Sequence, residues 1–299
     1  PQAARAVEAV DPAEDRGFAQ FVAAIAQRGA DLLRQARLVG DAGQVEVLMP
    51  PGTDAHAYAP SARDAARLRD ADLVVANGLG LEERLLDPLE AAEADGARVL
   101  HLAELLDPLE VDGADDEAAD DEGTDEHDGS GGHEGHEHGA LDPHVWMDPL
   151  RMAEGVRILG GWLADADTGG ALTEDEWSAR AEDLAGRLET LDRELEDRFA
   201  TLPDDRRRLV TNHDSLRYLA DRYGLEIVAT VIPATSSQSG PSARDVVELA
   251  EVVAELEVPA VFVEAEESTR LAEALAGEVG RDVEIVTLYT CLLYTSDAA

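Results

Sequence analysis

The chain has 299 residues, 44% of them hydrophobic, and its 65 acidic residues against 24 basic ones give a formal charge of −41. This length can form two domains with cores of ordinary size. The negative charge excludes nucleic acid as a partner, because the phosphates would be repelled. A single cysteine excludes a disulfide framework and any cysteine-based zinc site. No apolar run approaches the roughly 18 residues of a membrane span.

The first third of the chain predicts alternating helices and strands. Apolar residues spaced three or four apart indicate a helix, and short apolar or β-branched runs indicate strands. Helices are predicted at 18–38, 61–69 and 81–94, and strands at 45–49, 73–76 and 98–102. Short, mostly apolar strands that alternate with helices are typical of a parallel α/β sheet.

Two helices interrupt this alternation. Pro149 opens the first, over 149–165, because proline suits the first helical position. In the second, over 173–200, Thr173 and Glu176 have the spacing of a capping box. Apolar residues then recur at steps of three and four, which gives one apolar stripe. A helix of this length is roughly 40 Å long and can join two lobes.

The last third of the chain returns to the α/β pattern. Strands are predicted at 208–211, 226–232, 260–263 and 283–288, and helices at 214–223, 242–256 and 269–279. We therefore predict an α/β fold with two lobes of parallel sheet joined by one long helix. The predicted domains are a first lobe at 1–172, the joining helix at 173–200 and a second lobe at 201–290.

Five of the eight histidines lie between 127 and 144. Up to Gly139 this stretch consists of glycine, histidine, serine and acidic residues, which cannot bury enough surface to order themselves. We predict a disordered acidic loop at about 107–140, whose histidines are accessory metal binders. They are His127, His133, His136 and His138. His144 follows in an apolar segment and is expected to be ordered.

Two further histidines follow predicted strands. His56 lies in the loop after 45–49, and His213 comes directly after 208–211. Ligands of open α/β sheets bind beyond the carboxyl ends of the strands, and neutral imidazole is the commonest protein ligand for zinc and related ions. Together with His144, these residues predict a metal site between the lobes. His101, within the apolar run VLHL, is interpreted as a strand histidine instead.

Four segments, in the right order, resemble the zinc- and manganese-binding solute-binding proteins of ABC transporters. They are PPGTDAHAYAPSARDAARLRDADLVVANGLGLEERL, DPHVWMDP, LVTNHDSLRYLADRYGL and VFVEAEESTRLAEALAGEVG. The resemblance covers about residues 30–290. It implies two α/β lobes on a rigid long helix, with His56, His144 and His213 as the metal ligands. The His-rich acidic loop before the second segment is typical of the zinc-type members.

The resemblance also implies a function and a location. The protein would capture metal outside the cytoplasmic membrane, in the periplasm or as a lipoprotein anchored on the cell surface, and deliver it to an ABC transporter permease. Three imidazoles favour Zn²⁺, whereas Mn²⁺, the alternative, prefers oxygen ligands. We expect a monomer without enzyme activity. A metal-dependent adhesin of the same family is a second alternative. A zinc hydrolase is remote because the chain has no HExxH motif.

The carboxyl end departs from the family pattern. The family usually has a carboxylate after the last strand as a fourth ligand, whereas this chain has Cys291. The ending CLLYTSDAA has no counterpart in the family, and we predict that 291–299 is a non-native tail. Glu264, after strand 260–263, is expected either to face the site or to pair with a loop backbone.

Overall fold

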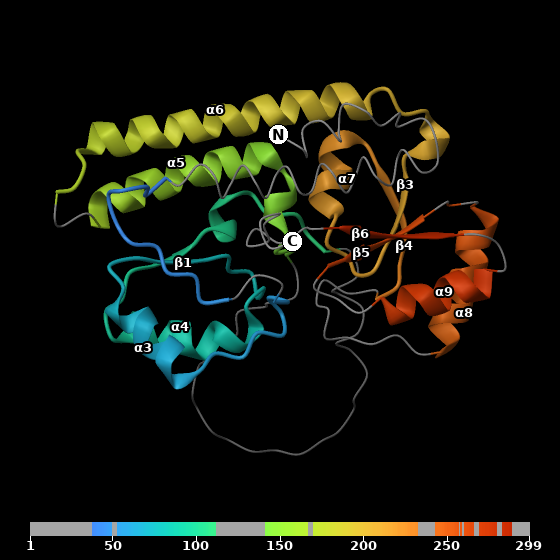
Figure 1. The fold of residues 1–299 in the computed structure, drawn as a ribbon, viewed down its shortest axis with the longest axis horizontal. Helices are drawn as coiled ribbons and strands as arrows, with labels where there is room; N and C mark the ends of the chain where they lie inside the picture. The colour runs from blue at the N-terminus through green and yellow to red at the C-terminus, as the bar shows by residue number, and fades with distance from the viewer. Residues whose placement is uncertain are drawn as a thin grey trace, which may run out of the picture.

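A computed structural model of the chain describes residues 38–49, 53–111, 141–166, 170–232, 243–256, 258, 260–265, 269–279 and 283–288. Figure 1 shows two α/β units side by side beneath one long helix, α6. The predicted two-lobed α/β architecture is confirmed. Several predicted features lie wholly or almost wholly outside the described residues: the helix at 18–38 except for its last residue, most of the His-rich loop with its four histidines, and the tail at 291–299.

The first lobe contains a short parallel sheet with two helices beneath it. Its elements are α3 (Ala62–Asp70), β1 (Val74–Ala76), the 3-10 turn η1 (Glu83–Leu85), α4 (Leu86–Ala94), β2 (Val99–His101) and the 3-10 turn η2 (Ala103–Leu105). β1 pairs with β2 in parallel. Ser61 caps α3 and exchanges hydrogen bonds with Asp64 in a capping box. A small core of Leu68, Leu85, Leu89 and their neighbours joins the helices to the sheet.

The strand predicted at 45–49 is wrong. These residues are described, and they form no strand. Val45 and Val47, the β-branched residues of this short run, are 66% and 53% exposed. Glu46 between them forms an exposed ion pair with Arg67 of α3, at 3.3 Å between Oε2 and Nε. The run therefore lies on the surface over α3 and does not pair with β1 or β2.

The second lobe contains a four-stranded parallel sheet. Its elements are β3 (Arg208–Thr211), α7 (Arg217–Tyr223), β4 (Glu226–Thr230), α8 (Ala243–Glu255), β5 (Ala260–Glu264), α9 (Arg270–Val279) and β6 (Glu284–Leu288). The strand order is β4-β3-β5-β6, which places β3 and β5 at the centre. Gly224 ends α7 in the left-handed conformation (φ 64°), which glycine adopts without strain. Apolar residues of α8, α9 and the strands form the outer core.

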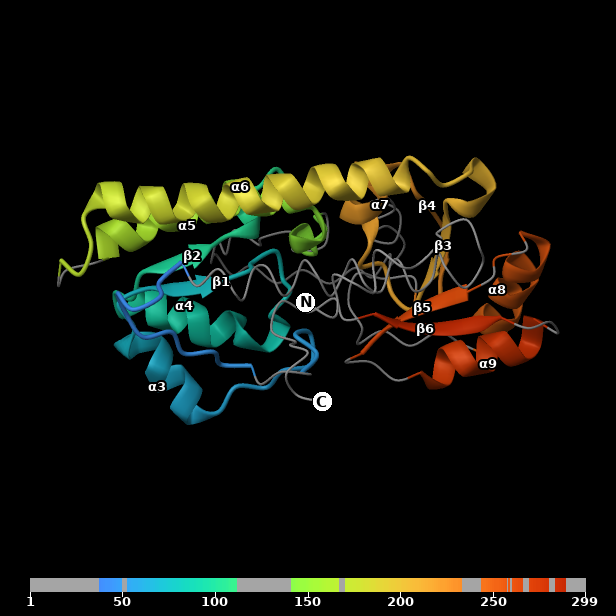
Figure 2. The ribbon, with the colours of Figure 1, turned by 45° about the horizontal axis from the view of Figure 1, so that its top comes forward.

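Helices α5 (Pro149–Ala166) and α6 (Glu174–Phe199) form the layer that crosses both lobes. Figure 2 shows α6 running from above the first lobe to above the second. Gly160 of α5 permits their close approach, because a Cβ there would lie 2.7 Å from the Cβ of Ala181. The capping box of Thr173 and Glu176 is confirmed. Helix α6 has 26 residues and is therefore about 39 Å long.

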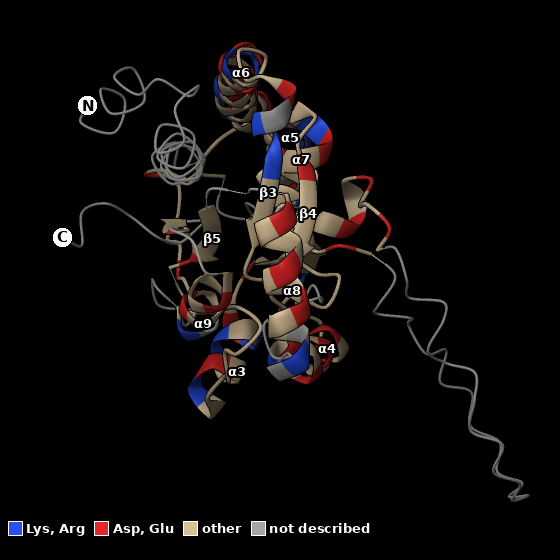
Figure 3. Ribbon diagram, turned by 90° about the vertical axis from the view of Figure 1, so that its right-hand side faces the viewer, with Lys and Arg blue, Asp and Glu red and all other residues tan. Residues whose placement is uncertain are grey.

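One hydrophobic core extends along α6 from the first lobe to the second. It includes Met147 and Val156 on one side, Leu188 of α6 in the middle, and Tyr223 and Phe262 on the other side. Closely packed interiors resist deformation, so this shared core fixes the lobes to each other. Acidic residues recur on the helices, including α4 and α8 (Figure 3). None of the helices in the described part of the chain is long and apolar enough to cross a membrane.

Candidate metal centre

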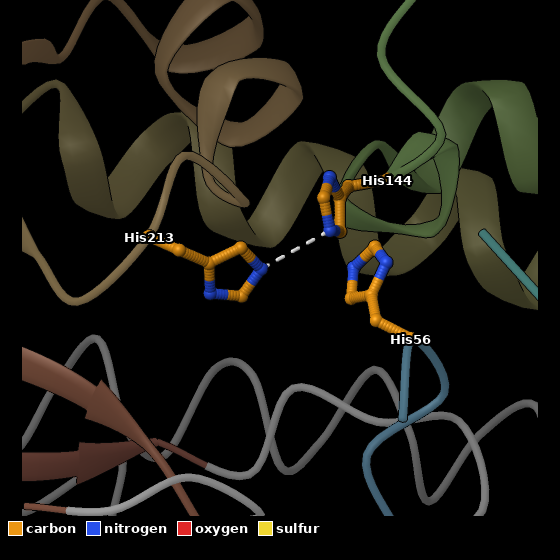
Figure 4. Close-up of side chains that lie close together, drawn as sticks. All are labelled: His56, His144 and His213. Carbon is orange, nitrogen blue, oxygen red and sulfur yellow. Dashed lines mark hydrogen bonds between the residues drawn. The ribbon is translucent and has the colours of Figure 1, made fainter. Parts of the chain in front are cut away.

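Three histidines from distant parts of the sequence meet between the two lobes. His56, His144 and His213 offer nitrogen atoms that all lie within 4.8 Å of one another. Their exposed fractions are 4%, 1% and 2%. Figure 4 shows the three rings converging, with Nε2 of His144 and Nε2 of His213 separated by 3.3 Å. The structure thus brings together the three residues that the sequence singled out.

Asp142 orients His144. Its Oδ1 accepts the backbone N–H of His144 at 2.9 Å and the ring Nδ1–H at 2.7 Å. A histidine that donates from Nδ1 carries its lone pair on Nε2, the atom that can bind metal. A 3-10 turn η3 (Val145–Met147) follows, and the ring of Trp146 lies edge-on to the ring of His144, with 5.2 Å between centroids. Asp148 then accepts the backbone N–H of Leu150 at the start of α5.

His56 lies in a tight turn of the first lobe. The Oδ1 atom of Asp54 accepts its backbone N–H at 2.9 Å, so both His56 and His144 follow an aspartate two residues earlier. Because 45–49 is not a strand, this turn does not lie at a strand end as predicted. The ring Nδ1 lies 3.5 Å from the carboxylate of Glu83 in η1. Nδ1 thus faces a carboxylate, and Nε2 is available for metal.

His213 follows the carboxyl end of central strand β3. The hydroxyl of Thr211 and the backbone N–H of Ser215 both donate to its carbonyl oxygen, at 2.8 and 2.9 Å. Its ring Nδ1 lies 3.6 Å from the carboxylate of Glu264, which ends the neighbouring strand β5. The hydroxyl of Ser215 donates to that same carboxylate. Glu264 therefore faces the back of the His213 ring.

The geometry and electrostatics suit a divalent metal ion. Two nitrogens bound about 2.0–2.1 Å from a tetrahedral zinc are about 3.3–3.4 Å apart, close to the 3.3 Å between the Nε2 atoms of His144 and His213. Burial, followed by the nearness of His144 and His213, lowers the pKa of His56 to about 4. At neutral pH His56 is uncharged and has a lone pair for metal.

The depressed pKa of His56 predicts a pH-dependent stability of the metal-free protein. In the unfolded chain His56 titrates near 6.5. Between pH 6.5 and 4 the unfolded state therefore binds a proton that the folded state does not, and stability falls as the pH is lowered. The shift corresponds to about 3 kcal/mol of unfolding free energy. The folded protein has this stability in full above pH 6.5 and loses it as the pH falls toward 4.

This dependence is measurable by urea unfolding of chelator-treated protein at pH 4.5 to 7.5. The His56→Gln variant lacks the titrating group and is expected to lose less stability on acidification than the unsubstituted protein. Carboxylates and the large net charge affect both proteins alike, so the difference between them isolates His56. Identical pH dependence of the two proteins would contradict the assignment.

Of the three carboxylates behind the rings, Glu264 was singled out from the sequence, whereas Asp142 and Glu83 were missed. Asp142 is fully buried, and Glu83 is in η1. The recurring pattern of an aspartate two residues before a converging histidine, DAH and DPH, is a signal that could have identified Asp142. Glu83 has no such signal, since it reaches His56 only through the packing of η1. His101 lies in β2 as interpreted, where its Nε2 is 3.1 Å from Glu93.

The fold defines a class of protein. Two α/β lobes, each with a parallel sheet and both spanned by one long helix, form the architecture of the helical-backbone metal receptors. The structure of the periplasmic zinc-binding protein TroA from Treponema pallidum is similar, with a TM-score of 0.70 and 26% identity over 86% of this chain and 84% of that one. The profile of the family described as zinc-uptake complex component A, periplasmic, matches residues 7–297. The chain therefore belongs to this family.

Sequence relatives are named for different metals, which include zinc, manganese and iron. The zinc-binding lipoprotein AdcA of Streptococcus pneumoniae is 32% identical over 84% of this chain, which spans only 46% of that relative's length. The manganese-binding lipoprotein MntA of Halalkalibacterium halodurans is 26% identical over 82% of this chain and 72% of the relative. Membership of the family therefore leaves the choice of metal to the site itself.

Proposed function

We propose that this protein captures zinc outside the cytoplasmic membrane and delivers it to an ABC transporter permease. The ligands are His56, His144 and His213. The observation that carries the proposal is the convergence of three buried imidazoles between the lobes. Relatives described as periplasmic or as lipoproteins support the location, either in the periplasm or anchored at the cell surface.

The ligand chemistry favours zinc over manganese. All three side chains at the centre of the site offer nitrogen, which suits zinc, whereas manganese prefers oxygen ligands. Carboxylates close to the rings of His56, His144 and His213 face the Nδ1 atoms of these rings. These carboxylates therefore lie on the Nδ1 side of the rings and do not offer oxygen ligands on the Nε2 side, where the three rings converge. The relative named for manganese keeps Mn²⁺ as the alternative cargo.

A carrier role also accounts for the site better than catalysis does. A zinc hydrolase needs a general base on the metal side of the ligands. Asp142, Glu83 and Glu264 are instead turned to the Nδ1 sides. Membership of a metal-uptake family supports the same conclusion. We expect no zinc-dependent turnover of a generic ester or peptide.

Calorimetry with metal-free protein tests the proposal. We expect about one tightly bound zinc per chain, with manganese bound more weakly, and additional weak sites on His127, His133, His136 and His138. A protein that binds no zinc tightly would refute the proposal. Tighter binding of manganese than of zinc would identify manganese as the transported metal and leave the proposed carrier role unchanged.

A deletion of residues 112–139 separates the tight site from the His-rich loop. Glu110 and Leu141 form an antiparallel bridge, so the cut ends lie close together and the deletion need not disturb the lobes. The tight zinc site is expected to remain with unchanged affinity, because its three ligands lie outside the deleted segment, and the weak sites should disappear. Loss of the tight site in this variant would show that its ligands lie in the loop.

A further inference from the structure

Tyr218 connects the second lobe to the backbone beside His144. It lies on α7 and is fully buried. Its hydroxyl donates to the carbonyl oxygen of Asp142 at 2.6 Å and accepts the backbone N–H of Leu109 at 3.0 Å. The guanidinium of Arg151 lies over its ring, 5.0 Å from the centroid. A single hydroxyl of the second lobe is therefore bonded to two backbone segments of the first.

These two backbone segments are bonded to each other as well. The N–H of Asp142 donates to the carbonyl oxygen of Leu109 at 2.8 Å, and Glu110 and Leu141 form an antiparallel bridge. Arg217, next to Tyr218 on α7, donates to the carbonyl oxygen of Glu110 at 3.0 Å. The backbone of Asp142 is thus held through its N–H by the first lobe and through its carbonyl by the second.

The carboxylate of Asp142 carries this constraint to the metal centre. Its Oδ1 holds both the backbone N–H and the ring Nδ1–H of His144. A shift of the Asp142 backbone would move that carboxylate and turn the ring, and with it the Nε2 atom that faces His213. Outer partners of metal-bound histidines fix the orientation of the ring in this way, and their loss typically weakens metal binding 10- to 100-fold.

We propose that Tyr218 and Asp142 are positioning residues of the metal centre. Tyr218 fixes the backbone of Asp142 across the lobe interface, and Asp142 fixes the ring of His144 for the metal. The inference rests on the proposed zinc site. It adds that the affinity of the site depends on a hydroxyl that does not touch the metal.

Tyr223 provides a matched control on the same helix. It is also a buried tyrosine, 6% exposed, and its hydroxyl also makes a hydrogen bond, at 3.0 Å to Oδ1 of Asp192 on α6. That bond belongs to the packing of α7 on α6 and has no contact with the three histidines. A phenylalanine at either position removes one oxygen atom and keeps the ring. The two variants therefore differ in which contact is lost.

The test measures zinc affinity of the full chain by competition with a chromophoric chelator, together with the melting temperature of the metal-free protein. Tyr218→Phe is expected to weaken zinc binding about 10-fold, and Asp142→Asn 10- to 100-fold. Tyr223→Phe is expected to lower the melting temperature while leaving zinc affinity within about two-fold of the unsubstituted protein, because only Tyr218 is linked to His144.

A double variant tests whether Tyr218 acts through Asp142. If it does, Asp142→Asn combined with Tyr218→Phe should bind zinc about as well as Asp142→Asn alone, because coupled residues are not additive. Unchanged affinity in Tyr218→Phe, equal losses in Tyr218→Phe and Tyr223→Phe, or fully additive losses would each overturn the inference. Failure of the unsubstituted protein to bind zinc would instead overturn the proposed function.

Discussion

Replacement of His144 by alanine is expected to weaken zinc binding by more than about 100-fold. Loss of an outer partner alone costs 10- to 100-fold, and this change removes a ligand itself. His144 is 1% exposed, and its Nε2 lies 3.3 Å from that of His213. Competition with a chromophoric zinc chelator measures the effect.

His101→Ala provides the matched control for this experiment. His101 is a half-buried strand histidine whose Nε2 lies 3.1 Å from Glu93, within the first lobe. Its replacement removes an imidazole without touching the three that converge, so zinc affinity should stay within about two-fold of the unsubstituted protein, since distant sites act independently. Tight zinc binding by His144→Ala, or an equal loss in His101→Ala, would contradict the assignment of the site.

The regular elements of the fold were predictable because their signals are local. The apolar stripe of the long helix, from Trp177 to Phe199, is buried along its length. The capping box of Thr173 and Glu176 marks a helix start that depends only on residues three positions apart. Signals of this kind do not depend on distant chain segments, and therefore the sequence predicted this helix.

The strand at 45–49 failed for the opposite reason. A short run of β-branched and apolar residues forms a strand only if a sheet edge accepts it. Val45 and Val47 have no such edge in the described part of the structure and remain exposed. Whether a short apolar run pairs is decided by distant chain segments, so local patterning could not settle it.

The three histidines of the candidate site were predictable from the sequence, whereas most of the residues that position them were not. The positions of the histidines relative to the predicted elements, together with the resemblance to a known family, selected His56, His144 and His213. Asp142 and Tyr218 use common residue types whose roles depend on three-dimensional contacts. Tyr218 lies 76 positions from the backbone oxygen that it binds. No periodicity or spacing rule connects residues so far apart.

Asp192 occupies an unexpected position on the apolar stripe of α6, and its charge is matched by α7. It is 3% exposed. Its two carboxylate oxygens accept Nε and Nη2 of Arg222 at 2.9 and 2.6 Å, and Oδ1 also accepts the hydroxyl of Tyr223. A two-point contact between carboxylate and guanidinium is geometrically specific. It ties the helix that spans both lobes to the first helix of the second lobe.

Asp192→Ala is therefore expected to lower the free energy of unfolding by about 3 kcal/mol. The change removes the carboxylate that accepts hydrogen bonds from the guanidinium of Arg222 and from the buried hydroxyl of Tyr223. Leaving a largely buried charge without its partner is strongly destabilising. The side chain of Arg222 is 22% exposed and lies 3.7 Å from Glu196, which limits the loss to the lower end of the usual range. Urea unfolding of the metal-free protein measures it.

Asp183→Ala separates this effect from a general change in charge. Asp183 lies on the exposed face of the same helix, and exposed substitutions usually change stability by less than about 0.5 kcal/mol. Both variants remove one negative charge from a protein of charge −41, so relief of self-repulsion is the same in both. An equal stability of the two variants would mean that the contact between α6 and α7 contributes nothing. A loss confined to Asp192→Ala would instead identify it as a fastening between the long helix and the second lobe.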